Sequence, residues 1–340
     1  MQDPEGVAGV TVSARRDEDA LRECLETIVE EKFGRRAAIA SVVRRGYDYS
    51  HSYASDILDL RLKDGRGLKI FMKDFGASTR IKDGVQGMRE RRERELRTYR
   101  DLLPGAALGT PEYLGSVWDA DDRHWLLLEF VEGIKLRYAD FDSWITAADW
   151  LARLQGYFAR EQDRWKDCPW LQVHDERFFR FRAQRALESI EGSYPHLAAR
   201  LRPIVRRYEG LIGFLASQPR TFVHGAYTPG TIFIAPTCQP VRVCPFDWEL
   251  AGLGSRLYDL AFLCDGFDEP RLDILLRTYE ERTVACGIAA PPRKDIRYLI
   301  DCFRLHIIIN FIGQTDERGY SEKDTRRLVA SAERLAELVL

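Results

Sequence analysis

The sequence predicts an α+β protein with a small strand-rich lobe, residues 1–131, followed by a larger, mainly helical lobe, residues 132–340. Up to about residue 130, short apolar runs alternate with polar residues between turn signals, as in half-buried strands. From Phe141 onward, apolar residues recur mostly at helical spacing. Short apolar runs within residues 221–246 interrupt that spacing and predict strands inserted in the helical lobe.

The small lobe is expected to begin with an amphipathic helix at residues 17–33 and to contain a charged helix at residues 84–103, stopped by Pro104. Between them, residues 64–67 read Asp-Gly-Arg-Gly and predict a hairpin turn, because glycine accepts positive φ. A second turn is expected at residues 119–122, after the charged helix. The strands expected around these two turns are residues 55–62, 68–75, 113–117 and 124–130.

The larger lobe is expected to be a helical body that carries one group of short strands. Its predicted helices are residues 147–158, 176–189 and 197–216, with further helices to the C-terminus. Its predicted strands are residues 221–223, 232–234 and 241–246. Clefts between two lobes of this kind are common ligand sites.

Composition excludes several classes of function. The net charge is −2, from 51 basic and 53 acidic residues, so neither nucleic acid nor an acidic membrane surface is indicated as a partner. The seven cysteines include no C-x-x-C pair, and the six histidines include no H-E-x-x-H pair, which argues against a zinc site or a disulfide framework. The first residues do not read as a secretory signal, so reduced cytoplasm is the expected location.

The most specific pattern is a pair of strand ends in the larger lobe. One strand runs into His224-Gly225 and the loop to Thr231, and a later strand ends in Asp247-Trp248-Glu249. A third segment, Leu257-Tyr258-Asp259-Leu260-Ala261, follows at a short distance. An aspartate at a strand end is a natural ligand for Mg²⁺, which prefers carboxylate oxygens.

These segments resemble the aminoglycoside phosphotransferase and choline kinase family, which has a two-lobed protein-kinase-like fold. That family has H-G-D-x-x-x-x-N in its catalytic loop, then D-W-E, then G-x-x-x-x-D-L-A. The resemblance implies ATP and Mg²⁺ as cofactors and catalytic roles for Asp247 and His224. The family counterpart of His224 mainly holds the loop, and that of Asp259 braces it, so we expect His224 to be structural more than proton-transferring.

The resemblance extends to the small lobe and implies its nucleotide contacts. The segment Leu126 to Gly133 is similar to the family hinge, so Glu129 and Val131 would hold the adenine by backbone groups. Lys73 would contact the ATP phosphates and Glu95 would be its helix partner. Residues that compete for these roles are Lys69, on the same strand face, and Glu90 and Glu93; a solvated helix face is the alternative for Glu95.

Departures from the family pattern affect the chemistry directly. Ala226 stands where the family has its catalytic aspartate, and alanine cannot accept a proton; a general base is typically worth ~10²–10⁴ in rate. Thr231 replaces the asparagine ligand, so the expected metal ligands are Asp247 and the weaker Thr231 hydroxyl. The turn at residues 46–52 has one glycine, which predicts looser cradling of phosphates.

A subgroup of the family, often encoded beside natural-product genes, is similar in further details. It shares the pair Lys73-Asp74 at the end of the third strand and has a loop of the type H-G-E-F-Y-P-S-N, from which Ala226 and Thr231 also depart. In the large lobe, Leu151 to Gln155 resembles the family's L-A-x-L-H helix, with glutamine in place of histidine. The subgroup suggests a role in natural-product biosynthesis.

Two main functions follow as hypotheses. The first is an atypical phosphotransferase that moves the γ-phosphate of ATP to a hydroxyl of a small metabolite or a peptide Ser/Thr. The second is a pseudokinase that binds nucleotide or peptide as a scaffold for a partner enzyme, motivated by Ala226 and Thr231. Transfer of AMP is a third, distant alternative. The basic-aromatic segment from Arg177 to Arg185 is expected to be an ordinary amphipathic helix, with a substrate surface as the alternative.

Overall fold

The computed structural model describes residues 5–47, 53–78, 87–119, 123–238, 240–289 and 292–340. The chain folds as two compact units. The first comprises Met1–Arg92 and Pro111–Glu132, and the second comprises Glu93–Thr110 and Gly133–Leu340. The α+β class is confirmed, with an antiparallel sheet in the first unit and a larger helical second unit. The division of function between two lobes stays a prediction.

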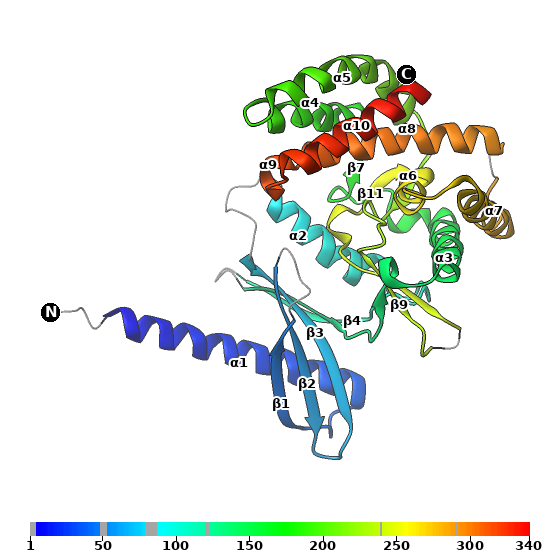
Figure 1. Ribbon diagram of the computed structural model, residues 1–340. Helices are drawn as coiled ribbons and strands as arrows, with labels where there is room; N and C mark the ends of the chain where they lie inside the picture. The colour runs from blue at the N-terminus through cyan, green and yellow to red at the C-terminus, as the bar shows by residue number, and fades with distance from the viewer. Residues whose placement is uncertain (1–4, 48–52, 79–86, 120–122, 239, 290–291) are drawn as a thin grey trace. The chain divides into compact units, whose positions relative to one another are not determined.

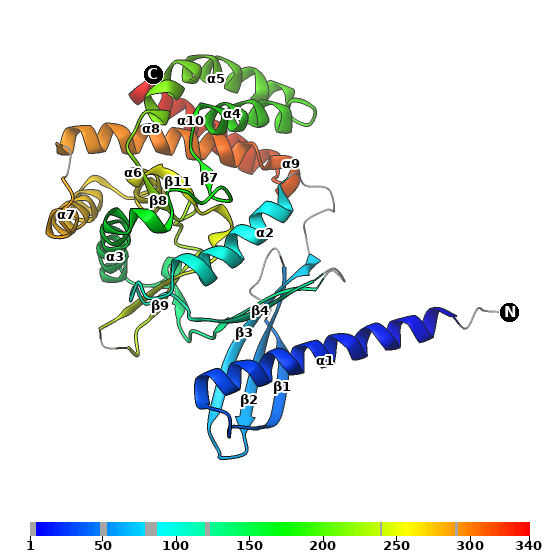
Figure 2. The same cartoon turned by 180° about the vertical axis from the view of Figure 1, so that it is seen from behind.

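The first unit is a five-stranded antiparallel sheet in the order β1-β2-β3-β5-β4, with one long helix on one face. Leu25, Ile28 and Val29 of the helix belong to one buried cluster with strand residues such as Leu58 and Ile70, and Figure 2 shows the helix α1 lying along the sheet. The elements are α1 (Glu5–Phe33), β1 (Ile39–Gly46), β2 (Tyr53–Leu62), β3 (Gly67–Ser78), β4 (Tyr113–Trp118) and β5 (His124–Glu129).

The predicted β2–β3 hairpin is confirmed, with Gly65 at φ 87° and the Asp64 carboxylate accepting from Arg66 N at 3.0 Å. Strand β1 was not predicted. Its residues beyond Ile39 are exposed, including Val42 and Val43, so no apolar alternation marks it in the sequence. The second predicted turn and the segment at 46–52 lie mostly outside the described residues, as does the start of the charged helix at 84–86.

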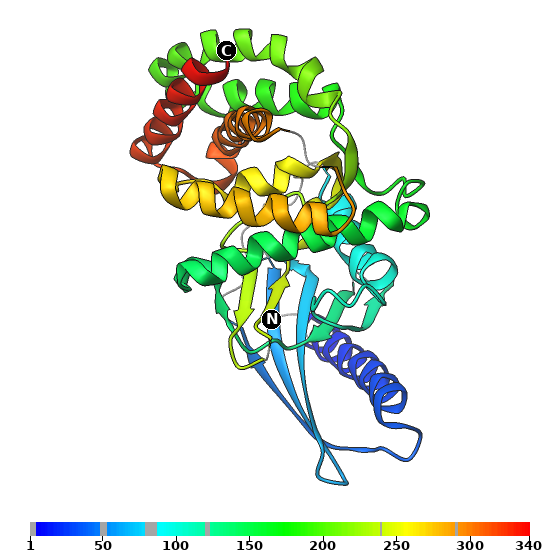
Figure 3. The same cartoon turned by 90° about the vertical axis from the view of Figure 1, so that its right-hand side faces the viewer.

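The second unit is mainly helical. In it α4 packs on α5 and α8, and α8 on α10 (Figure 1), while α3 and α7 lie side by side (Figure 3). The predicted charged helix continues past α2 as a π-helical turn at Thr98–Leu102. The helices are α2 (Met88–Arg97, which straddles the two units), α3 (Phe141–Arg160), α4 (Glu176–Glu191), α5 (Pro195–Ala216), α6 (Arg256–Leu263), α7 (Glu269–Ala285), α8 (Arg293–Ile312), α9 (Thr315–Arg318) and α10 (Glu322–Val339).

Two small three-stranded sheets in the second unit position the loops of interest. One has the order β10-β9-β6 and the other the order β7-β11-β8. The predicted strands at 221–223, 232–234 and 241–246 are confirmed, while the other three strands of these sheets were not predicted. The strands are β6 (Ile134–Lys135), β7 (Gln172–Val173), β8 (Arg220–Val223), β9 (Ile232–Ala235), β10 (Arg242–Pro245) and β11 (Gly252–Ser255).

Two further findings bear on location and redox state. All seven cysteines are free thiols. Within the described residues, no helix has the length and apolar character needed to cross a bilayer. The cytoplasmic location stays a prediction.

Candidate active site

The loop between β8 and β9 is held by one buried carboxylate. Asp259, on the first turn of α6, is fully buried and accepts hydrogen bonds from the backbone N–H groups of His224 at 2.7 Å and Gly225 at 2.9 Å. Burial raises the pKa of Asp259 to about 7, and the two N–H donors oppose that rise because they favour the carboxylate. Asp259 therefore braces the loop, as the sequence predicted.

Gly225 is required at the start of this loop for two reasons. Its φ is 80°, in the region that favours glycine. In addition, a Cβ at this position would lie 2.0 Å from the carbonyl oxygen of Leu250. The loop backbone thus passes directly against the segment that follows Asp247, and no side chain fits between them.

The His224 ring is a structural part of the loop. It is fully buried, its Nδ1 accepts from Ala226 N at 3.3 Å, and its Nε2 lies 3.0 Å from the carbonyl oxygen of Phe246. The first bond needs a bare Nδ1, so the proton is on Nε2 and is donated to Phe246. Burial lowers the pKa of His224 to about 4, so the ring is neutral at pH 7. These bonds support the structural role that we expected for it.

Thr231 closes the loop on itself. Its hydroxyl donates to the carbonyl oxygen of Ala226 at 2.6 Å and accepts from Thr228 N at 3.1 Å. The side chain at the asparagine position therefore bonds across the loop to the very residue that replaces the aspartate. Its role as a metal ligand stays a prediction, and the bonds above leave the oxygen only one lone pair for it.

Asp247 ends the neighbouring segment in a left-handed conformation, with φ 62° and ψ 59°. Aspartate tolerates this region better than most residues, yet the conformation is uncommon and often marks functional sites. The next residue, Trp248, is fully buried and stacks on Phe222, so a rigid base supports the half-buried carboxylate. Asp247 is thus both accessible and firmly positioned.

The charged helix α2 is tied to the same segment. Arg94 is buried and donates to the carbonyl oxygens of Trp170 at 3.0 Å and Glu249 at 2.6 Å. Sequence reasoning did not single out Arg94, because nothing in a run of alternating charges marks the one that is buried. The bond to Glu249 fixes the helix to the Asp-Trp-Glu turn.

Glu95 is separated from its competitors by burial. It is 2% exposed, whereas Glu90 is exposed and Glu93 is half-buried with an ion pair to Arg97. The solvated-face alternative therefore does not hold for Glu95. Burial first, and then the negative charges of Glu95 and Asp247, raise the pKa of the buried Tyr99 hydroxyl. Both carboxylates thus act on the same buried hydroxyl of the second unit.

Lys73 is similarly distinguished in the first unit. It is 5% exposed on β3, and its Nζ lies 5.2 Å from the ring centroid of Tyr53 and 5.3 Å from that of Phe75. Lys69, the competing lysine, is exposed. A buried ammonium requires compensating interactions, and the rings of Tyr53 and Phe75 supply part of them. Its contact with phosphates stays a prediction.

The predicted hinge follows β5. The backbone N–H of Glu129 donates to the carbonyl oxygen of Glu112 at 2.9 Å, and its carboxylate accepts from Glu112 N at 3.2 Å. Among the described residues, no hydrogen bond to or from the Val131 backbone occurs. The backbone N–H of Glu129, in contrast, is already bonded to Glu112. The adenine contact itself stays a prediction.

Two further segments resolve as structural. On α4, Arg180 pairs with Glu209, Arg182 donates to Asn310 and Arg185 pairs with Asp316, which supports the ordinary amphipathic helix. Gln155, in the place of the family histidine, is buried between the carbonyl oxygen of Arg256 and the Tyr279 hydroxyl.

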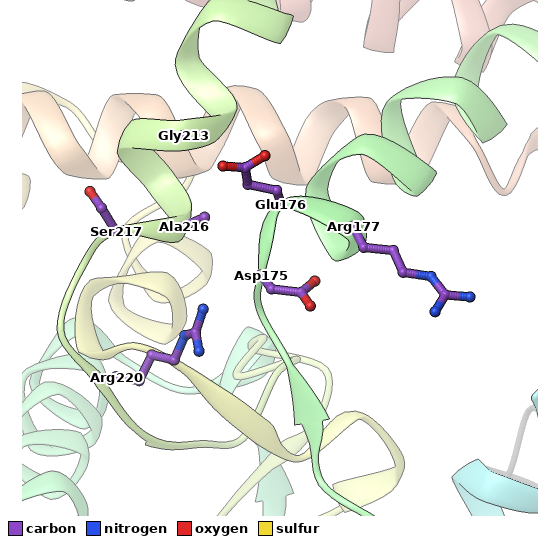
Figure 4. A pocket seen from close by; sticks show the side chains of 7 residues that line it. All are labelled: Asp175, Glu176, Arg177, Gly213, Ala216, Ser217 and Arg220. Atoms are coloured by element: carbon purple, nitrogen blue, oxygen red, sulfur yellow. The ribbon is translucent and has the colours of Figure 1, made fainter.

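One pocket, of about 360 Å³, lies where α5 ends and α4 begins. Figure 4 shows Glu176 and Arg220 reaching into it while Arg177 points away. None of the predicted site residues lines this pocket, and its lining mixes both signs of charge. We therefore do not assign it to the predicted chemistry.

Comparison with known proteins now identifies the class. The model of the phosphotransferase enzyme family (APH) matches residues 80–293, so the chain belongs to that family. A search of curated protein sequences found no match.

Solved structures show the same fold at low sequence identity. Choline kinase from Cryptosporidium parvum Iowa II superposes with a TM-score of 0.63 at 11% identity, covering 93% of this chain and 96% of that one. The GDP complex of wild-type aminoglycoside 2′-phosphotransferase-IIIa gives 0.58 at 13%, covering 93% and 99%. A microcompartment-associated aminopropanol kinase gives 0.51 at 15%, covering 88% and 91%. The protein-kinase-like fold predicted from the sequence is therefore confirmed.

Proposed function

We propose that this protein is an ATP-dependent phosphotransferase that moves the γ-phosphate to a hydroxyl of a small metabolite or of a peptide Ser/Thr. The observation that carries the proposal is the intact frame around Asp247. The loop is braced by Asp259 and His224, and the carboxylate sits on a rigid left-handed turn. The GDP complex of aminoglycoside 2′-phosphotransferase-IIIa, which has the same fold, supports a nucleotide as the donor class.

The cofactor chemistry fits the residues present. Within the described residues, no group of three or more His, Cys, Asp or Glu side chains could hold a metal ion. Mg²⁺ in nucleotide-dependent sites is commonly held by one or two carboxylates plus phosphate oxygens and water, so the single carboxylate of Asp247 suits a Mg²⁺–nucleotide complex. Bound Mg²⁺ would neutralise charge on the phosphates. Asp247 would orient that complex, and Lys73 would contact a phosphate.

Transfer without a carboxylate at position 226 relies on positioning. Phosphoryl transfer proceeds through a loose transition state in which placement and charge neutralisation supply most of the catalysis. Ala226 removes the proton acceptor, so we expect a slow enzyme, or an acceptor that supplies its own base. The loop still presents a defined surface at this point, because Thr231 bonds to the Ala226 carbonyl oxygen.

The second candidate function is a pseudokinase scaffold, and one observation favours it. The two loop positions that hold the catalytic aspartate and the metal-binding asparagine in the family lack those groups here. Ala226 has no polar side chain, and the Thr231 hydroxyl is hydrogen-bonded within the loop. A protein of this kind would bind nucleotide or a partner and transfer nothing.

The thermal unfolding midpoint with and without Mg²⁺–ATP tests the proposal first. A ligand at 100 times its Kd stabilises by about 2.7 kcal/mol, a rise of a few degrees at this size. We expect a saturable, Mg²⁺-dependent rise in the native protein and in the control Asp167→Asn, an exposed acid, and none in Asp247→Asn. Incubation with [γ-³²P]ATP and candidate acceptors then separates transfer from binding alone.

These two measurements have three informative outcomes. A rise that is lost in Asp247→Asn, followed by labelled product, establishes the phosphotransferase. The same rise with no labelled acceptor across metabolite and peptide pools favours the scaffold. No rise at millimolar nucleotide contradicts both nucleotide-dependent readings.

A further inference from the structure

Two cations that the sequence motifs do not include lie against the candidate loop. Strand β6 pairs with β9, and Lys135 stands opposite Phe233 in that pairing. The Lys135 Nζ is 5.9 Å from the ring centroid of Phe246, the residue immediately before Asp247. A two-residue strand thus carries a lysine to the base of the segment that ends in the candidate metal ligand.

Arg137 reaches the loop itself. Its backbone N–H donates to the carbonyl oxygen of Pro229 at 3.1 Å. A Cβ added at Gly230 would lie 2.0 Å from an Arg137 guanidinium nitrogen, so this guanidinium rests on the loop backbone where Gly230 leaves room. The φ of Gly230 is not positive, so the space beside this glycine is filled by the flexible Arg137 side chain, which an alanine at this position would push aside.

Among the described residues, Lys135 and Arg137 form no ion pair and no side-chain hydrogen bond, unlike the arginines of α4. Lys135 is half-buried; burial and the neighbouring Arg137 charge lower its pKa, and Asp247 opposes this. Because Asp247 offsets this lowering only in part, a further anion beside the two cations would stabilise their charged forms. The arrangement therefore suits a negatively charged ligand.

We propose that Lys135 and Arg137 form a binding site for a phosphate or carboxylate group carried by the acceptor substrate. Such a group would accept charge-assisted hydrogen bonds from both side chains, with Arg137 suited to bidentate contact. Arg137 lies on the stretch Pro229–Gly230 of the loop that carries Ala226, so an acceptor held there has its hydroxyl near the place where the family positions its base. Anchoring by an anion would supply part of the positioning that the missing carboxylate cannot.

The assignment to the acceptor rests on the proposed phosphotransferase function, whereas anion binding does not. Binding is therefore measured without catalysis. Inorganic phosphate is titrated calorimetrically into the full-length protein, with and without a saturating, non-hydrolysable Mg²⁺–ATP analogue. The variants are Lys135→Met/Arg137→Met and, as a control, Lys323→Met/Arg207→Met, which removes the same charges from exposed positions on α10 and α5.

We expect phosphate to bind the native and control proteins in the millimolar range, with or without the analogue. We expect at least a tenfold loss of affinity in Lys135→Met/Arg137→Met, with an unchanged thermal midpoint. Gly230→Ala keeps both charges but displaces the guanidinium, so a loss of phosphate affinity in it would support the geometry.

Three outcomes overturn the proposal. The first is no phosphate binding by the native protein up to tens of millimolar. The second is equal affinity in the native protein and in Lys135→Met/Arg137→Met. The third is phosphate binding that the analogue abolishes, together with a weaker analogue affinity in that double variant, because the pair would then hold the nucleotide's own phosphates.

Discussion

Two buried histidine environments in the second unit differ in how completely their polar atoms are bonded. At the candidate loop, both ring nitrogens of His224 have partners. In the helical core, the Nδ1 of His174 and the Nε2 of His306 have none among the described residues, although the other nitrogen of His306 bonds the Tyr208 hydroxyl at 2.7 Å. Burial holds the pKa of all three rings well below the usual value.

The contrast shows that the candidate loop is hydrogen-bonded more completely than the helical core around His174 and His306. A fully bonded polar network rigidifies one geometry, whereas unbonded buried groups cost stability without specifying one. The loop has kept such a network even though Ala226 has removed the family's proton acceptor. Frame and chemistry are therefore separate properties of this loop, and each can be tested without the other.

The largest effect is expected from breaking the frame at Gly225. Gly225→Ala forces a Cβ into the carbonyl of Leu250 at a φ of 80°. We expect the free energy of unfolding to fall by about 4 kcal/mol or more. The control Gly210→Ala, on α5 with nothing within 4 Å of its Cβ, should be neutral or stabilising. Equal urea midpoints for the two variants would contradict the assigned geometry.

The next largest effect is expected from restoring a carboxylate at position 226 of the loop. Ala226→Asp returns a carboxylate to the family position, and we expect Mg²⁺-dependent ATP hydrolysis to rise by about 100-fold, with water as the acceptor. Ala226→Asn has the same shape without the base and should leave the rate unchanged. If both variants bind nucleotide and neither hydrolyses it faster, the missing carboxylate is not what limits this site.

The third prediction concerns the pH dependence of stability that arises from the buried His224 ring of the loop. The folded pKa of His224, about 4, lies below the ordinary value of 6.5, so the unfolded chain takes up the proton first and stability falls as pH drops through 6.5 toward 4. From pH 7 to pH 5 the loss from this ring is about 2 kcal/mol. Asp259, whose pKa is raised to about 7, contributes with the opposite sign throughout this range and by a similar amount, so the two contributions largely cancel in the native protein.

This contribution is isolated by difference. We expect His224→Gln to lose less stability than the native protein between pH 7 and pH 5, by about 2 kcal/mol, in urea unfolding followed by circular dichroism. His196→Gln changes an exposed histidine and should retain the native profile. A native profile in both variants would mean that the His224 ring is charged in the folded loop.

The smallest effect is expected at Thr231. Thr231→Val deletes the bonds to Ala226 and Thr228, and we expect a loss of about 1 kcal/mol in unfolding free energy. Thr315→Val removes a buried hydroxyl that has no partner among the described residues, so it should be neutral or slightly stabilising. An identical loss in both would show that the Thr231 hydroxyl does not hold the loop.

Much of this frame could be predicted from the sequence, because it depends on local patterns. Alternating apolar residues located β2, the turn signals located β3, β4 and β5, and the loop motif located His224, Asp247 and Asp259. Strand β1 could not be found, since an exposed edge strand has no buried face to impose alternation. The four-residue strand β11, Gly-Leu-Gly-Ser, carries too few apolar residues to register.

Site residues could be predicted from the sequence only where they belong to one continuous motif. The burial of Glu95 and the exposure of Lys69 depend on what packs over them, which no spacing rule supplies. Lys135 and Arg137 were missed because their meaning comes from Phe246 and Gly230, far along the chain. The signal that could have drawn attention to them is the second glycine of the loop, Gly230, at a position that needs no positive φ.

The internal hydrogen bonds of the loop have an evolutionary consequence. Alanine and aspartate codons can differ by a single nucleotide, and so can those of threonine and asparagine. Asp259, His224 and Gly225 hold the loop backbone without the side chain at position 226. A substitution at that position is therefore expected to leave the loop conformation unchanged. A lineage carrying this gene could therefore regain or lose proton-transfer chemistry in one step while the rest of the protein remains folded.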